Sequence, residues 1–144
     1  MSQTPMTDLI EMIRQLQPMM DPEEYVFLSF ADPGSVDAAA LEPLCGFQEQ
    51  EGLSLIIRAG TARAKGYTSE PRFHRITLTV LSSLESVGLT AAVASCLAEK
   101  RISVNVVAAF HHDHLFVPAG QAEAAMEALH QLSGGGRRDR PVAG

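Results

Sequence analysis

The second half of this 144-residue chain carries the pattern that most restricts its fold. Residues 73–80 alternate between apolar and polar side chains, which is the period-two pattern of a strand buried on one face. Apolar residues in 89–97 and again in 122–132 repeat at helical spacing, while 102–110 and 114–117 have the composition of strands. The predicted order is strand, helix, strand, strand, helix. A right-handed crossover followed by a local hairpin puts the helices on one face of an antiparallel sheet, so we expect an α+β, ferredoxin-like fold.

A complete ferredoxin-like βαββαβ unit needs one more strand, and none is predicted after residue 132. An unpaired sheet edge would favour aggregation. We therefore expect the sheet to be completed by another subunit or by a strand from the first half of the chain. The preferred donor is the aromatic and apolar stretch 24–30.

The first half predicts a second, smaller set of elements. A short amphipathic helix runs from Asp8 toward Pro18, and the stretches 47–51 and 53–58 form a hairpin that turns at Gly52. A brief helix at 61–65 precedes a polar stretch that closes with a proline.

These elements predict how the chain divides. We expect one module at 1–68 and a second at 69–133. The Gly-rich and charged segment 134–144 is expected to be a disordered tail.

Charge excludes two classes of partner. The chain has 11 Lys and Arg against 17 Asp and Glu, a net charge of −6, whereas nucleic acids and anionic lipids are bound by clustered cations. The basic cluster Arg137, Arg138 and Arg140 lies in the predicted tail and is interpreted as part of a frayed end. We expect no nucleic-acid partner and no membrane partner.

The expected location is the cytoplasm. Residues 1–8 are polar and lack the apolar core of a secretory signal, and no stretch approaches the length of a membrane span. The two cysteines, Cys45 and Cys96, are therefore expected as reduced thiols.

Three phrases of the second half resemble a known family. They are SSLESVGLTAA at 82–92, ISVNVVA at 102–108 and HHDHLFVP at 111–118. Together they resemble bacterial ACT-domain proteins related to the CASTOR-type arginine sensors. The first half is similar more loosely, through YVF at 25–27 and EQEGL at 49–53, so the likeness covers roughly residues 7–132.

The resemblance implies two ACT-like modules with antiparallel sheets, amino-acid binding at module interfaces and no catalytic machinery. In this family the ligand lies by the loop that joins the first strand to the first helix. The residues at that place are Ser86, Val87, Gly88, Leu89 and Thr90.

Physical chemistry supports this location. A glycine lets the backbone approach a small ligand, and the free N–H groups at a helix start attract a carboxylate. An ammonium group would need an acceptor, for which Glu85, Asp113 and Glu51 are candidates. A structural alternative is a plain helix start capped by Ser86. Asn105, in an apolar strand, is either a ligand contact or a hydrogen-bonded core amide.

The run from His111 to His114 allows a different function. On a strand, His112 and His114 share a face and could hold Zn²⁺ together with His74, although no Cys or Glu stands at a confirming spacing. The other interpretations are a polar hairpin turn that carries Asp113 and a wall of a binding site.

The sequence therefore predicts a non-catalytic regulatory or sensor protein without a cofactor. It would bind a free amino acid between its two ACT-like halves or across a homodimer, and act on an enzyme or regulator. Two alternatives stay open: a metal-binding protein or metal-dependent enzyme that uses His111, His112 and His114, and a protein–protein interaction module without a ligand.

Overall fold

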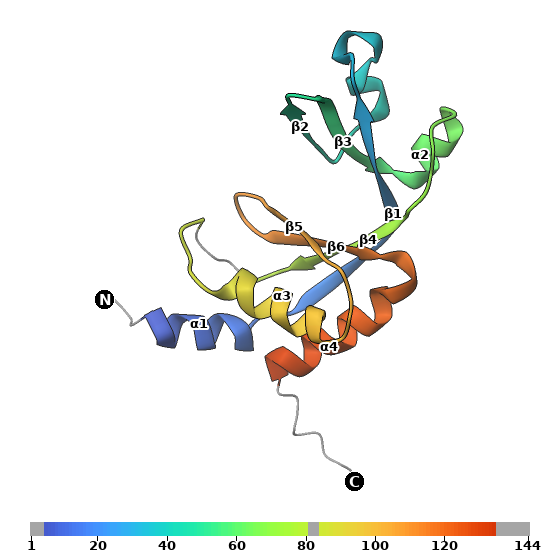
Figure 1. Ribbon diagram of the computed structural model, residues 1–144. Coiled ribbons are helices and arrows are strands. Elements are labelled where there is room, and N and C mark those ends of the chain that lie inside the picture. The colour runs from blue at the N-terminus through green and yellow to red at the C-terminus, as the bar shows by residue number, and fades with distance from the viewer. Residues whose placement is uncertain (1–4, 81–83, 135–144) are drawn as a thin grey trace. The chain divides into compact units, whose positions relative to one another are not determined.

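The chain folds as an α+β protein, as the sequence predicts. The computed structural model describes residues 5–80 and 84–134 (Figure 1), so the predicted tail lies outside the described residues from 135 onward. The main elements in chain order are α1 (Pro5–Arg14), β1 (Pro18–Phe30), β2 (Cys45–Glu49), β3 (Gly52–Arg58), α2 (Ala59–Ala64), β4 (Phe73–Leu78), α3 (Leu89–Glu99), β5 (Asn105–Ala108), β6 (Asp113–Pro118) and α4 (Ala122–Gly134).

The strands of the described residues form a six-stranded antiparallel sheet in the order β2-β3-β1-β4-β6-β5. The chain divides into two compact units. The C-terminal unit combines the residues up to Asp21 with those from His74 onward, and the N-terminal unit is Pro22–Phe73. The strand β1 begins in the first of these units and ends in the second.

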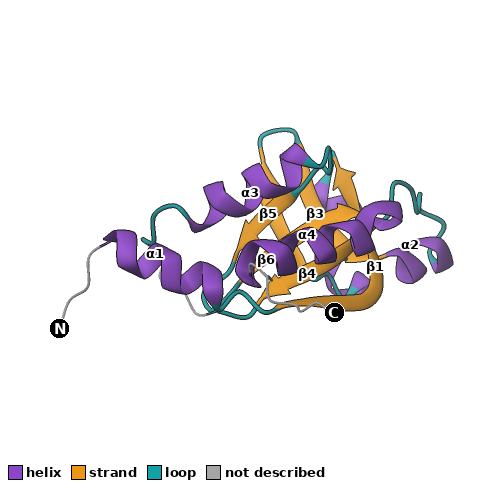
Figure 2. Ribbon diagram, turned by 90° about the horizontal axis from the view of Figure 1, so that it is seen from below, coloured by secondary structure: helices purple, strands orange, loops and turns teal. Residues whose placement is uncertain are grey.

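The core of the C-terminal unit lies between its helices and its strands. Figures 1 and 2 show α3 and α4 across one face of β4, β5 and β6. The buried side chains come from one face of each helix and from alternate positions of β4 and β6, as the two sequence periods predict. They include Leu89, Val93, Leu97, Ala125, Leu129, Ile76, Leu78, Leu115 and Val117.

The residues just before β1 and the first residues of β1 complete the sheet of this unit. The backbone carbonyl of Leu16 accepts a bond from Thr79 N, that of Gln17 accepts from the Thr79 hydroxyl, and that of Asp21 meets the His74 ring. The strand predicted to complete this sheet, 24–30, is part of β1, but its predicted first residue is wrong. It begins six residues earlier, at Pro18, and the stretch from Tyr25 onward pairs with β3.

Two further boundaries differ from the sequence prediction. The first helix begins at Pro5 and not at Asp8. The strand predicted at 102–110 is shorter, because Ile102 N donates to Leu97 O and Arg101 takes a left-handed conformation, φ 61°. Residues 101 and 102 thus form the turn that ends α3, and they lie outside the strand.

The N-terminal unit is built on the predicted hairpin. Strands β2 and β3 pair from Glu49 and Gly52, so Gln50 and Glu51 form a two-residue turn. The core of this unit is made by the face of β1 and β3 that packs on the short helices, and consists of Val26, Leu28, Leu41, Leu55, Ile57, Ala59 and Ala62.

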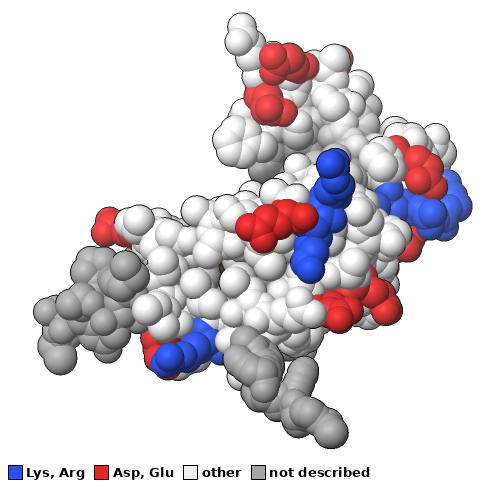
Figure 3. Space-filling model, turned by 60° about the horizontal axis from the view of Figure 1, so that its bottom comes forward, with Lys and Arg blue, Asp and Glu red and all other residues white. Residues whose placement is uncertain are grey.

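Charged residues on the molecule's surface are mixed. On the face that Figure 3 draws, groups of Lys and Arg side chains lie beside Asp or Glu side chains. None of the helices in the described part of the chain has the length and apolar composition that a membrane span requires. Cys45 and Cys96 are half-buried free thiols.

Polar pairs hold the strands of the C-terminal unit together on the face opposite its core. Arg75 donates to the Asp21 carboxylate at 2.9 Å, and the Thr77 hydroxyl lies 2.9 Å from Nδ1 of His114. Burial lowers the pKa of His114, the neighbouring Arg75 and His112 lower it further, and Asp113 acts in the opposite direction.

Replacing Gly52 should destabilise the N-terminal unit. Gly52 has φ 142°, which side-chain-bearing residues rarely adopt, and a Cβ there would collide with the backbone carbonyl of Phe30. We expect Gly52→Ala to lower the free energy of unfolding by at least about 2 kcal/mol, measured by urea unfolding.

Gly60→Ala is the matched control, because a Cβ at Gly60 meets nothing within 4 Å and the residue lies in α2. This variant should be neutral or more stable by up to about 1 kcal/mol. Equal stability of the two variants would contradict the conformational role assigned to Gly52.

Acidification should destabilise the protein through His114. Since the pKa of His114 is lowered in the folded chain, the unfolded chain binds the proton more readily below a pH of about 6.5. The free energy of unfolding therefore falls as pH drops from 7 toward 5. His114→Asn should flatten this dependence in urea titrations at several pH values.

Candidate ligand-binding site

The loop before α3 is shaped by Gly88. This residue is the N-cap of α3 in a left-handed conformation, φ 101° and ψ −24°, and the cap position makes no side-chain hydrogen bond to the helix. Residues with a side chain rarely adopt this φ, and a Cβ at Gly88 would stand 2.9 Å from Cδ2 of Leu9, which would have to shift. The alternative in which Ser86 caps the helix is wrong. Among the residues that the structure describes, the first N–H groups of α3 have neither helical partners nor a side-chain cap.

The hairpin between β5 and β6 faces this helix start. Ala108 pairs with Asp113 across the two strands, and Ala109 N donates to His112 O at the turn. Side chains at directly paired positions project from the same side of a hairpin. The methyl of Ala108 and the carboxylate of Asp113 are therefore neighbours.

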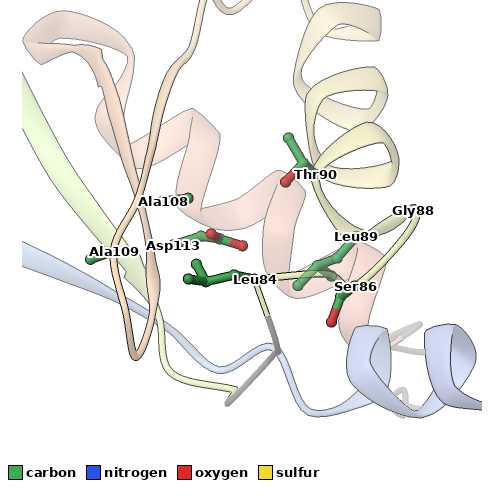
Figure 4. Close-up of a pocket in the computed structure, with 8 residues that line it drawn as sticks. All are labelled: Leu84, Ser86, Gly88, Leu89, Thr90, Ala108, Ala109 and Asp113. Atoms are coloured by element: carbon green, nitrogen blue, oxygen red, sulfur yellow. The ribbon is translucent and has the colours of Figure 1, made fainter.

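The loop, the start of α3 and the hairpin enclose a small pocket of the C-terminal unit (Figure 4). Its volume is about 100 Å³, and its lining residues are Leu84, Ser86, Gly88, Leu89, Thr90, Ala108, Ala109 and Asp113. In Figure 4 the carboxylate of Asp113 points from the hairpin toward the side of the pocket where α3 begins.

Most of the predicted site residues meet in this pocket. Ser86, Gly88, Leu89, Thr90 and Asp113 all line it, although Asp113 lies more than twenty positions away in the sequence. Of these, Leu89 is buried beneath the pocket as part of the core.

Two predicted residues do not line the pocket. Val87 projects into solvent with 80% of its surface exposed. Asn105 is also exposed, at the end of β5 away from Ala108, where it pairs with Phe116. Its interpretation as a core amide is therefore wrong.

Leu84, Ala108 and Ala109 line the pocket without having been predicted. Apolar residues of this kind are common in loops and strands, so nothing in the sequence singled them out. Knowledge of the hairpin register would have identified Ala108, because Ala108 pairs with the predicted residue Asp113.

Only one of the three candidate acceptors for an ammonium group reaches the pocket. Asp113 lines it, Glu85 lies in the loop without lining it, and Glu51 belongs to the turn of the N-terminal unit. The pocket thus offers free helix N–H groups, which suit a carboxylate, and the Asp113 carboxylate, which suits an ammonium group.

The histidines of the hairpin do not converge. The ring centroids of His111 and His112 are 6.3 Å apart, and His114 is bonded to Thr77. Within the described residues, no group of three or more His, Cys, Asp or Glu side chains could hold a metal ion. His112 Nδ1 is buried without a hydrogen-bond partner in that part of the chain.

Comparison with known proteins agrees with the observed fold. Models of the ACT domain match residues 4–74 and residues 72–131. No curated protein matches the chain. A Vibrio cholerae protein of unknown function, described as a possible transport protein, is 43% identical, with a TM-score of 0.77 over 88% of this chain and 96% of that one.

Two aspartate kinase structures share the fold at low sequence identity. The aspartokinase alpha and beta subunits are 15% identical and the regulatory subunit of aspartate kinase from Thermus flavus is 13% identical. Each has a TM-score of 0.59, with coverage of 80% of this chain and 95% of the other. With both halves matched by ACT-domain models, and with a 43% identical relative along most of its length, the chain belongs to the ACT-domain family as a tandem ACT-domain protein.

Proposed function

We propose that this chain is a non-catalytic regulatory protein that binds a free amino acid in the pocket between the start of α3 and the β5–β6 hairpin. The observation that carries the proposal is the meeting of Asp113 with the uncapped start of α3 in one pocket. A free amino acid presents one carboxylate and one ammonium group a few ångströms apart. The two ends of this pocket complement those two charges.

The similarity to regulatory subunits of aspartate kinase agrees with a regulatory role. We further propose the finer relation to the CASTOR-type sensors, a cytoplasmic location, and an enzyme or regulator as the partner that responds. In a homodimer, a second copy could share the bound ligand. The proposed domain limits are 1–68 and 69–133.

Regulation requires that the ligand bind one arrangement of the protein better than another. Leu9 of α1 lies against Gly88, at the loop that the ligand would touch. The chain passes from α1 directly into β1, which continues into the N-terminal unit. A ligand that moves the loop at Gly88 would therefore act on α1 and, through it, on β1.

A thermal-shift screen of the full chain against the twenty amino acids at millimolar concentration tests the proposal. A ligand at 100 times its dissociation constant stabilises the folded state by about 2.7 kcal/mol, so a specific ligand should raise the melting temperature by several degrees. If no amino acid raises it, the proposal fails and an interaction module without a ligand becomes the better interpretation.

Asp113→Asn should weaken the binding of the amino acid that the screen identifies. Losing a charge-assisted hydrogen bond to the ammonium group should raise the dissociation constant about 10- to 100-fold by titration calorimetry. Asp113 is a better choice than Gly88, because the φ of 101° at Gly88 would strain any residue that carries a side chain.

The matched control is Asp37→Asn. Asp37 is exposed, precedes the short helix Ala38–Leu41 and makes no side-chain bond to it. This variant should bind as the unchanged protein does. Equal loss of affinity in both variants would contradict a role for Asp113 in the pocket.

A further inference from the structure

We propose that the pocket selects a neutral amino acid with an aliphatic side chain, and that this side chain packs on Leu84. The inference rests on the proposed function and names the class of amino acid that the same pocket takes. It follows from the charge of the lining residues, from the size of the pocket and from the exposed apolar side chain of one lining residue, Leu84.

The charges of the lining residues favour a ligand with no third charge. Among the eight described residues that line the pocket, Asp113 is the one with an ionisable side chain. Once Asp113 holds the ammonium group and the start of α3 holds the carboxylate, a further charge on the ligand meets no opposite charge in the lining. A second carboxylate would also be repelled by Asp113, and a second cation would lose water without gaining a partner.

The size of the pocket places the ligand's side chain at its mouth. An apolar cavity of about 150 Å³ holds the six carbon atoms of benzene, so about 100 Å³ holds roughly four atoms of that size. That is close to the carboxylate, ammonium group and Cα of an amino acid. The side chain must therefore extend toward the surface of the loop and the hairpin.

Leu84 offers apolar surface at that position. It lines the pocket and is nevertheless 66% exposed, whereas most leucines of the unit are buried. In Figure 4 its side chain points from the loop toward the hairpin that carries Asp113. The hairpin contributes Ala108 to the same lining, and the side chain of Ala108 is a single methyl group. An aliphatic ligand would remove apolar surface of Leu84 from water, and a polar one would lose its own hydration there.

Three free amino acids of the same shape test this inference. Leucine, asparagine and aspartate have side chains with the same branched arrangement of heavy atoms and differ in polarity and charge. We expect titration calorimetry on the full chain to rank leucine above asparagine and asparagine above aspartate, with leucine at least about tenfold tighter than aspartate.

Leu84→Ser isolates the contribution of the proposed wall. This variant should reduce leucine binding about tenfold while binding of alanine, whose side chain is too short to cover Leu84, changes little. Since Leu84 is largely exposed, the melting temperature without ligand should stay the same. Phe47→Ser, which removes a 72% exposed side chain on β2, is the control and should leave both affinities unchanged.

The outcomes separate this inference from the proposed function. Tightest binding of aspartate, asparagine or arginine would overturn the aliphatic preference while leaving an amino-acid-binding protein. Tight binding of leucine that Leu84→Ser does not weaken would overturn the role of Leu84. Binding of no amino acid would overturn the proposed function and this inference together.

Discussion

The left-handed turn at Gly88 is the constraint on which the candidate site depends. Glycine adopts this conformation at little cost, and the missing side chain lets Leu9 of α1 close against the loop. The helix α3 can then begin immediately, with Leu89 already in the core. Because Leu89, Val93 and Leu97 fix the helix on the sheet, its uncapped end is held where the β5–β6 hairpin brings Asp113. The geometry of the pocket thus follows from core packing and one backbone conformation.

The fold was predictable where one period dominates the sequence. The alternation at 73–80 and the helical spacing at 89–97 each bury one face, and the structure has β4 and α3 at those places. The start of β1 was missed because Pro18 and Pro22 resemble strand breakers. They are tolerated because Pro18 is the first residue of the strand, and Pro22 stands where β1 passes from one compact unit to the other. That β1 spans two compact units depends on contacts between distant parts of the chain, which a local sequence pattern does not reveal.

The site was predictable only in part, for a similar reason. A glycine at a helix start and a carboxylate in a hairpin are unusual enough to suggest a role, and Gly88 and Asp113 do meet. The direction of a side chain is harder to infer. Val87 stands between the lining residues Ser86 and Gly88, yet its own side chain is exposed to solvent. Asn105 is in a strand of apolar composition, yet that strand lies at the sheet edge and leaves its amide exposed.

Different residues of the pocket lining would meet the charged groups that all amino acids share and the side chains that distinguish them. The start of α3 and the Asp113 carboxylate complement groups that every free amino acid carries, so in the proposed function they would contribute affinity without choosing among ligands. Selection among amino acids would have to come from the pocket residues that contact the ligand's side chain. Those residues are apolar, and no pattern in the sequence marked them. The similarity to aspartate kinase subunits, at 13–15% identity, shows the fold and says nothing about these apolar lining residues. Under the proposed function, the identity of the ligand would therefore depend on Leu84 and Ala108 more than on family membership.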